Sequence, residues 1–195
     1  MSYDLLNNIE ELDLHMQEII MNCTSEDQFR DALDSHLFAE SYGKLFMSRR
    51  KFVGNCQDDG TIYFSNVPVG RNESKFKYFA GSINKSKINS MFAQNIAYYN
   101  KDPYKELQLF SWLSHPKFIH LIKLSDNIEL IADICYILNN YPKVAPYNAY
   151  TIKDLEYAFT KNPLHIYRSW DIDYSFHYSE VINETLNVIT NAGNN

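Results

Sequence analysis

The sequence is poor in residues that break or cross-link a chain, with 6 Gly, 6 Pro and 3 Cys among 195 residues. The three cysteines, Cys23, Cys56 and Cys135, are odd in number, lie far apart and form no Cys-x-x-Cys pair. This spacing speaks against a disulfide framework and against a cysteine-rich zinc site.

Long apolar runs are also missing. No stretch approaches the ~18 apolar residues that a membrane-spanning helix needs, and the acidic N-terminal segment lacks the basic start and apolar centre of a signal peptide. We therefore expect a cytoplasmic protein without a membrane segment.

Common nucleotide-binding and catalytic signatures are absent as well. The chain contains no GxGxxG, no GxxxxGK[ST], no GxSxG and no HExxH. These absences argue against the common nucleotide-using enzymes and zinc proteases, and the main interpretation below assigns no cofactor and no metal site.

The residues that are present favour a folded α+β protein. Hydrophobic residues make up 45% and aromatic residues 15% of a chain whose length suits one domain. The patterns predict a single domain over residues 1–195, helical over 1–48, with a β-hairpin over 50–82 and helical or mixed structure over 84–195. We expect a mostly helical protein with a small antiparallel sheet that includes the hairpin around 61–80.

Several element boundaries follow from local signals. A capping box at Thr24 or Ser25 with Gln28 predicts a helix start, and Pro68–Gly70 has the chemistry of the hairpin turn. Asp102-Pro103 predicts a helix that continues through Leu113. Residues 118–124 fit a buried strand, residues from 125 to 141 form the most regular helical pattern, and 182–189 mark a final helix.

The charges are distributed unevenly along the chain. Residues 1–43 carry a net charge of −9, residues 44–87 carry +6, and residues 88–195 carry −3. We name residues 44–87 the basic segment, and its positive charges interleave with aromatic side chains. Such a surface suits a phosphate backbone with stacked bases, although the acidic N-terminal helices could equally neutralise it inside the fold.

This asymmetry supports a non-enzymatic interaction protein as the main functional hypothesis. The chain would be an inhibitor, an immunity factor or a phage- or virus-type accessory factor that binds a protein or nucleoprotein partner, with nucleic acid as a further candidate. The candidate partner-binding residues are Arg49, Arg50, Lys51, Arg71, Lys75, Lys77, Lys85, Lys87 and Trp170.

The alternative hypothesis is a small nucleic-acid-binding protein or nuclease. Asp59, followed by a strand and then by Glu73-Ser74-Lys75, resembles the Asp…Glu-x-Lys order of metal-dependent nucleases on a β-hairpin. The resemblance implies that two carboxylates hold Mg²⁺ and that the lysine positions the attacking water. The expected turn near Gly70 would place Glu73 in a turn rather than inside a strand, which counts against the match.

A metal-independent version of the alternative uses Arg30 and His36. Their spacing resembles that of helical ribonucleases of the HEPN type, in which the histidine would transfer protons and the arginine would offset phosphate charge. Residues six positions apart share a helix face poorly, so an ordinary histidine near a helix end is the better explanation of His36.

Overall fold

The structure is a computed structural model, and it describes residues 14, 16, 18–20, 22–48, 52–53, 56–57, 59–76, 84–140, 149–173 and 175–192. Along the described part of the chain, groups of strands are separated by helices. The elements are α2 (Glu26–Glu40), β1 (Leu45–Met47), β2 (Phe52–Val53), β3 (Cys56–Gln57), β4 (Gly60–Phe64), β5 (Val67–Ser74), α3 (Lys85–Lys101), η1 (Lys105–Leu107), β6 (Phe110–His115), β7 (Phe118–Lys123), η2 (Ser125–Asn127), α4 (Ile128–Asn140), α5 (Ala149–Lys161), β8 (Arg168–Asp171) and α6 (Tyr178–Ala192).

A six-stranded mixed sheet forms the centre of the molecule, in the order β1-β4-β5-β6-β7-β8, and β2 pairs separately with β3. Neighbouring strands of the large sheet are antiparallel except β5 and β6, which are parallel. The exception follows from the connection, because α3 lies between β5 and β6 and returns the chain to the edge at which β5 began.

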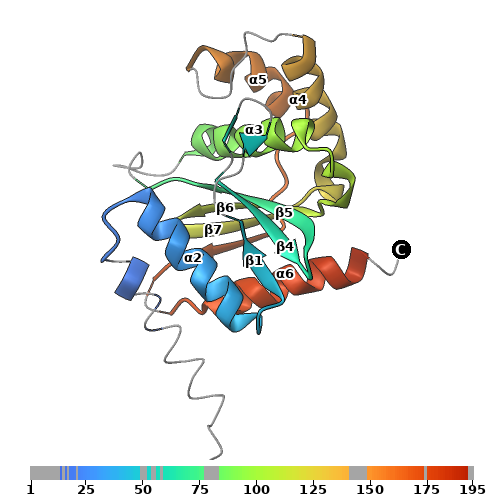
Figure 1. Cartoon of the computed structure of the whole chain (residues 1–195). Coiled ribbons are helices and arrows are strands. Elements are labelled where there is room, and N and C mark those ends of the chain that lie inside the picture. The colour runs from blue at the N-terminus through green and yellow to red at the C-terminus, as the bar shows by residue number, and fades with distance from the viewer. Residues whose placement is uncertain are drawn as a thin grey trace, which may run out of the picture.

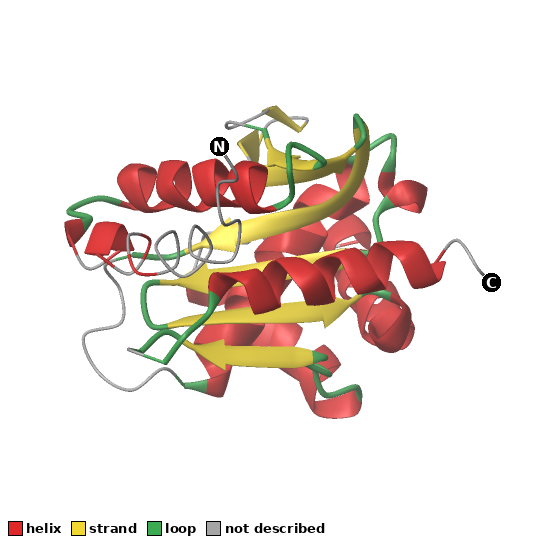
Figure 2. Cartoon of the chain, turned by 90° about the horizontal axis from the view of Figure 1, so that it is seen from below, coloured by secondary structure: helices red, strands yellow, loops and turns green. Residues whose placement is uncertain are grey.

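Helices cover both faces of this sheet (Figure 1). On one side lie α3, α4 and α5, with α3 against β5 and β6 and with α5 packed on α3 and α4. On the other side lie α2 and α6, in front of the strands in Figure 2. Two hydrophobic clusters result. Trp112 joins the cluster under α2 and α6, whereas its neighbour Leu113 joins the cluster under α3, α4 and α5.

The sheet is larger than the sequence predicts, and the expectation of a small antiparallel sheet is wrong. The main cause is β6, which the sequence assigns to a helix that starts at Asp102-Pro103. All six residues of β6 are buried, because the strand lies between β5 and β7 and has helices over both faces. A strand buried on both faces has no alternation of apolar and polar residues, so its apolar spacing matches a helix just as well.

The hairpin forms, but its turn lies earlier than predicted. Ser65 and Asn66 make the turn with positive φ angles of 49° and 68°, the backbone of a tight two-residue hairpin. The segment from Pro68 to Gly70 is part of β5. Because the turn lies earlier, Glu73 belongs to strand β5 instead of the turn, and it pairs with Leu113 of β6.

The predicted start of α2 at Ser25 and the helical patterns of α4 and α6 are confirmed, unlike the helix predicted from Asp102-Pro103. Ser25 caps α2 by accepting a hydrogen bond from the Gln28 amide at 3.2 Å, and the Gln28 side chain accepts one from the Thr24 amide at 2.8 Å. The predicted strand over 118–124 is β7, and the last two regular patterns are α4 and α6.

Gly70 permits close contact between β5 and β6. A Cβ atom there would lie 2.5 Å from Cε2 of the Phe110 ring, which is fully buried. We predict that Gly70→Ala lowers the free energy of unfolding by about 1–3 kcal/mol, because an extra methyl group must displace a packed ring. Urea denaturation of both proteins measures the difference, and an unchanged midpoint would show that the ring moves freely.

None of the helices within the described part of the chain has both the length and the apolar character needed to cross a membrane.

Candidate functional site

The β4–β5 hairpin brings Asp59, Glu73 and Lys75 to one end of the central sheet. Thr61 pairs with Arg71 and Gly60 with Asn72, so Asp59, just before β4, lies opposite the end of β5. Glu73 and Lys75 are two residues apart and therefore project from the same face of the sheet. The three side chains thus meet although Asp59 and Glu73 are 14 positions apart in the sequence.

Direct contacts join the three side chains. Lys75 Nζ donates a hydrogen bond to Glu73 Oε1 at 2.5 Å and lies 4.0 Å from Asp59 Oδ2. Asp59 Oδ2 also accepts a hydrogen bond from the Ser74 backbone amide at 3.0 Å. The lysine is therefore shared between two carboxylates that approach it from neighbouring strands.

Arg30 of α2 completes the group. Its guanidinium donates a hydrogen bond to Asp59 Oδ1 at 2.8 Å and forms an ion pair with Asp27, one helical turn earlier. Arg30 is only 6% exposed, and a buried guanidinium is tolerated because both ends of its fork meet carboxylates.

Glu73 has the most unusual environment of the four side chains. Its side chain is 2% exposed, and Oε2 is buried without a hydrogen-bond partner among the described residues. Burial, followed by the nearby charge of Asp59, raises the pKa of Glu73 to about 8. In the absence of a further positive charge, this carboxyl group tends to hold a proton near neutral pH.

The pKa of Lys75 is raised, although burial acts to lower it, because the charges of Glu73 and Asp59 outweigh the burial. A proton on Glu73 removes part of that stabilisation, so Glu73 and Lys75 titrate as a pair. The raised pKa of Lys75 keeps this side chain an ammonium at neutral pH.

A polar network on the opposite face of the sheet fixes the end of β5. Ser74 Oγ lies 2.9 Å from Ser114 Oγ, and both hydroxyl groups contact the Asn72 side chain at 2.7–2.8 Å. The Lys75 amide donates to the Ser114 carbonyl at 3.0 Å. These bonds set the register of β5 against β6 and hold Glu73 and Lys75 in place.

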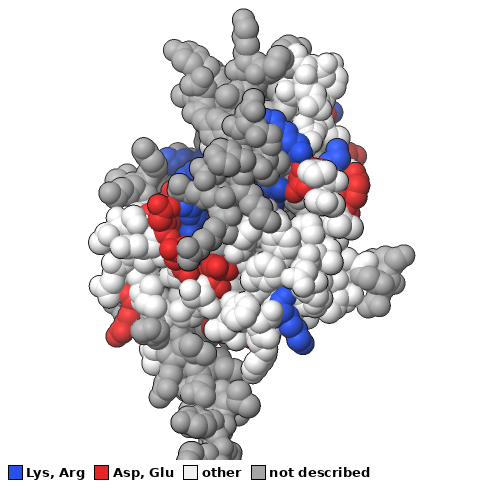
Figure 3. Space-filling model, in the orientation of Figure 1, with Lys and Arg blue, Asp and Glu red and all other residues white. Residues whose placement is uncertain are grey.

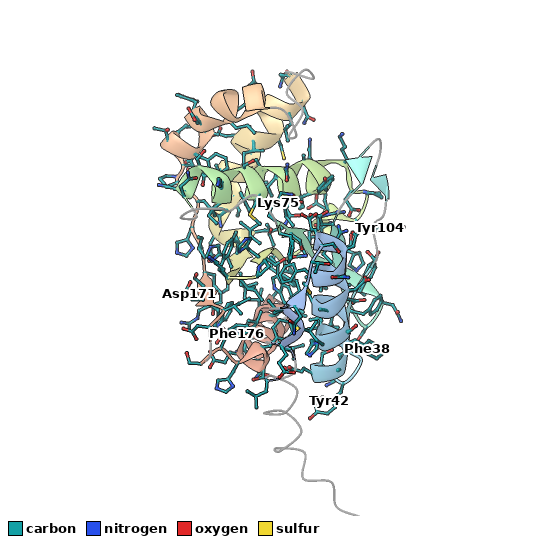
Figure 4. All side chains as sticks on the ribbon, turned by 90° about the vertical axis from the view of Figure 1, so that its left-hand side faces the viewer. Phe38, Tyr42, Lys75, Tyr104, Asp171 and Phe176 are labelled. Atoms are coloured by element: carbon teal, nitrogen blue, oxygen red, sulfur yellow. The ribbon has the colours of Figure 1, made fainter. Side chains whose placement is uncertain are left out.

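We name the acidic cluster the group formed by Glu26, Asp27, Asp59 and Glu73. With Arg30 and Lys75 it holds four carboxylates against two cations among the described residues. Figure 3 shows acidic side chains along α2 with basic ones beside them. In Figure 4, Lys75 lies near one end of α2, whereas Phe38 and Tyr42 lie towards the other end.

The donor atoms fit a divalent cation of the magnesium type. Asp59 and Glu73 offer carboxylate oxygens, which Mg²⁺ prefers, and one of these oxygens is buried without a partner. Within the described ranges, no three His, Cys, Asp or Glu side chains converge as a complete metal site. Mg²⁺ is compatible with this set because it commonly binds one or two carboxylates and takes its other ligands from water and phosphate.

The structure distributes the predicted partner-binding residues among different environments. Arg71 is 2% exposed and ion-paired with Asp102, and Lys75 belongs to the site above. Lys85 lies in the first turn of α3, where it is exposed, and Lys87 is half-buried. Trp170 of β8 is half-buried against the core. Arg49, Arg50, Lys51 and Lys77 lie outside the described residues.

The side chains of Arg30 and His36 contact different groups of residues. Arg30 contacts Asp27 and Asp59, whereas His36 is 5% exposed, places Nδ1 3.0 Å from the Ala32 carbonyl oxygen and packs edge-on against Tyr178. The contacts described for the two side chains do not bring them together. The structure therefore offers no support for a metal-independent site built on this pair.

Sequence reasoning missed the contribution of Arg30 to the Asp59 site and that of Ser114 to the polar network. Arg30 precedes Asp59 by 29 residues, and Ser114 follows Ser74 by 40. An isolated arginine in the acidic segment 1–43 was the one available signal, because a lone base among ten acids is a candidate for a buried ion pair.

A scan against models of protein families and searches of curated proteins and of solved structures found no match to this chain.

Proposed function

We propose that this protein hydrolyses phosphodiester bonds of nucleic acid with a divalent cation held by Asp59 and Glu73. The observation that carries the proposal is the convergence of Asp59, Glu73 and Lys75 in the Asp…Glu-x-Lys order, with Oε2 of Glu73 buried and unpartnered. Glu73 lies within β5, and the objection that it belongs to a turn no longer applies.

The proposed chemistry assigns a distinct role to each side chain. A bound Mg²⁺ would supply positive charge beside the scissile phosphate and lower the pKa of a water molecule. Asp59 and Glu73 hold the cation. Lys75 remains an ammonium between them, donates hydrogen bonds to the attacking water or a phosphate oxygen, and offsets the negative charge that develops during the reaction.

Nucleic acid is the substrate class that the rest of the chain supports. The basic segment supplies six more positive than negative charges over residues 44–87, and phosphate backbones bind to such segments through their charge. The Asp…Glu-x-Lys resemblance indicates the same substrate.

Cleavage assays with single variants test the proposal. We expect the wild-type protein to cut DNA or RNA with Mg²⁺ or Mn²⁺ and to stop when EDTA is added. Lys75→Met and Asp59→Asn should each lower the rate by about 100-fold or more, because each removes a group that acts on the reacting atoms.

Lys161→Met is the matched control, since Lys161 is half-exposed and pairs with Asp133 of α4, away from the site. It should cleave at the wild-type rate. A purified wild-type protein that cuts neither single- nor double-stranded DNA or RNA with either metal would overturn the proposal, as would full activity in Lys75→Met.

The hypothesis of a non-enzymatic interaction protein stays a prediction. Of the nine bases in the basic segment, four lie outside the described residues, and Arg71 and Lys75 are engaged inside the fold. The convergence of Asp59, Glu73 and Lys75, rather than the basic segment, is the reason to prefer the nuclease.

A further inference from the structure

Arg30 is a buried cation held between two carboxylates of different elements. Asp27 belongs to the first turn of α2 and is 67% exposed, whereas Asp59 precedes β4 and is 15% exposed. Arg30 therefore connects the start of α2 to the start of β4. Its burial among these groups makes it unavailable to solvent and to a large ligand.

The Asp59 carboxylate is fixed at both of its oxygens. Oδ1 accepts from Arg30 at 2.8 Å, and Oδ2 accepts from the Ser74 amide at 3.0 Å while facing Lys75 at 4.0 Å. Two anchored oxygens define the plane of a carboxylate. The Ser74 amide alone would leave that plane free to rotate.

We propose that Arg30 is a positioning residue that orients Asp59 for cation binding, with Asp27 as the counter-charge that holds Arg30. This inference rests on the proposed function, because the cation is the one that Asp59 and Glu73 would share. Arg30 itself touches neither the cation nor the substrate in this scheme.

The chemistry of the guanidinium explains why this position carries arginine. A planar fork can bind Asp27 and Asp59 at the same time, which the single ammonium of a lysine does less well. The positive charge of Arg30 also reduces the repulsion among the acidic cluster. Arg30→Gln removes both the fork and the charge, and Arg30→Lys removes mainly the fork.

The first measurement follows the Ser74 amide directly. In Arg30→Gln, Asp59 loses one anchor, and we expect the Ser74 amide to exchange its hydrogen about fivefold faster or more, as loss of one hydrogen bond predicts. Exchange is measured by NMR on the metal-free protein. Arg168→Gln, which makes the same change at an exposed arginine of β8, should leave the Ser74 rate unchanged.

The second measurement is the affinity for Mn²⁺ by calorimetry across pH 6 to 9. Loss of a residue that orients a metal ligand typically weakens binding by about 10–100-fold. We expect Arg30→Gln to show this loss throughout that pH range, because Asp59 loses the anchor at Oδ1. Arg30→Lys should recover part of the affinity, and Asp27→Asn should lose a smaller part.

Each outcome decides a different claim. If the wild-type protein binds no Mn²⁺, both the proposed function and this inference are overturned. If the wild-type binds Mn²⁺ and folded Arg30→Gln or Arg30→Lys binds it equally well with an unchanged Ser74 amide, the proposed function stands and the positioning role is overturned. If Arg30→Gln fails to fold, Arg30→Lys and Asp27→Asn decide the inference by the same two measurements.

Discussion

Glu73→Gln is expected to stabilise the metal-free protein above neutral pH while abolishing both divalent-metal binding and cleavage. Burial raises the pKa of Glu73 to about 8 from a value of 4.5. A carboxyl group with a raised pKa binds a proton in the folded state over a range in which the unfolded chain has released it. The free energy of unfolding of the wild-type therefore falls as the pH rises from about 4.5 to about 8. The Glu73→Gln variant does not lose this stability, because glutamine does not titrate.

The size of the effect follows from the same shift. We expect wild-type and variant to have similar stability near pH 4.5, and the variant to be more stable by a few kcal/mol, on the order of 2–4, at pH 8.5. Urea denaturation at several pH values in EDTA measures the difference. Saturating Mg²⁺ should restore much of the stability of the wild-type and none of that of the variant, because only the wild-type carboxylate binds the cation.

Glu129→Gln is the matched control, since Glu129 is an exposed residue in the first turn of α4. Its stability should follow the wild-type curve with pH, and it should cleave normally. A Glu73→Gln protein whose stability falls with pH as steeply as that of the wild-type would show that Glu73 is ionised in the fold without cost. Retained Mg²⁺ binding in the variant would remove Glu73 from the metal site.

Arg71→Met is expected to lower the free energy of unfolding by about 3–5 kcal/mol, the cost of leaving the partner of a buried ion pair uncompensated. Arg71 is 2% exposed in the middle of β5, and its guanidinium pairs with Asp102 at the end of α3. Gln108 closes the group, because Oε1 accepts from Arg71 Nε at 3.2 Å and Nε2 donates to Asp102 Oδ2 at 2.8 Å. The group fixes both ends of the connection from α3 to β6.

The double variant Arg71→Met/Asp102→Leu separates the ion pair from the packing. Removing both charges relieves the unpaired carboxylate, so we expect the double variant to be more stable than Arg71→Met alone. Urea denaturation of the four proteins of this cycle measures the coupling, and Arg168→Met serves as the exposed-arginine control. An Arg71→Met protein as stable as the wild-type would show that the ion pair contributes nothing. A selective loss of nucleic-acid binding instead would restore the original assignment of Arg71 to the partner-binding set.

The candidate site was predictable in part. The Asp…Glu-x-Lys order can be found in the sequence, since residue types and approximate spacing suffice to detect it. Its geometry was not predictable, because the position of the turn decides where Glu73 lies. Ser65 and Asn66 adopt positive φ angles without any glycine, whereas Pro68 and Gly70 carry stronger turn signals and belong to the strand.

The net charge of each segment was predictable from the sequence, but the charges that reach the surface were not. The sequence shows that residues 1–43 are acidic and residues 44–87 are basic. In the structure, Arg30 of the acidic segment forms an ion pair with Asp59 of the basic segment. Arg71 of the basic segment pairs with Asp102, which lies outside both segments. Charges that look alike along the chain therefore have different roles in the fold.

The sequence by itself determined the features that depend on residues within one or two turns of each other. The Ser25 cap and the apolar stripes of α4 and α6 belong to this group, because a cap or a helical stripe requires only neighbours three to four positions away. The tertiary structure alone decided the six-stranded sheet, the strand identity of β6 and the convergence of Arg30, Asp59, Glu73 and Lys75. These features depend on pairing between segments tens of residues apart, where burial on both faces removes the periodic signal that sequence analysis needs.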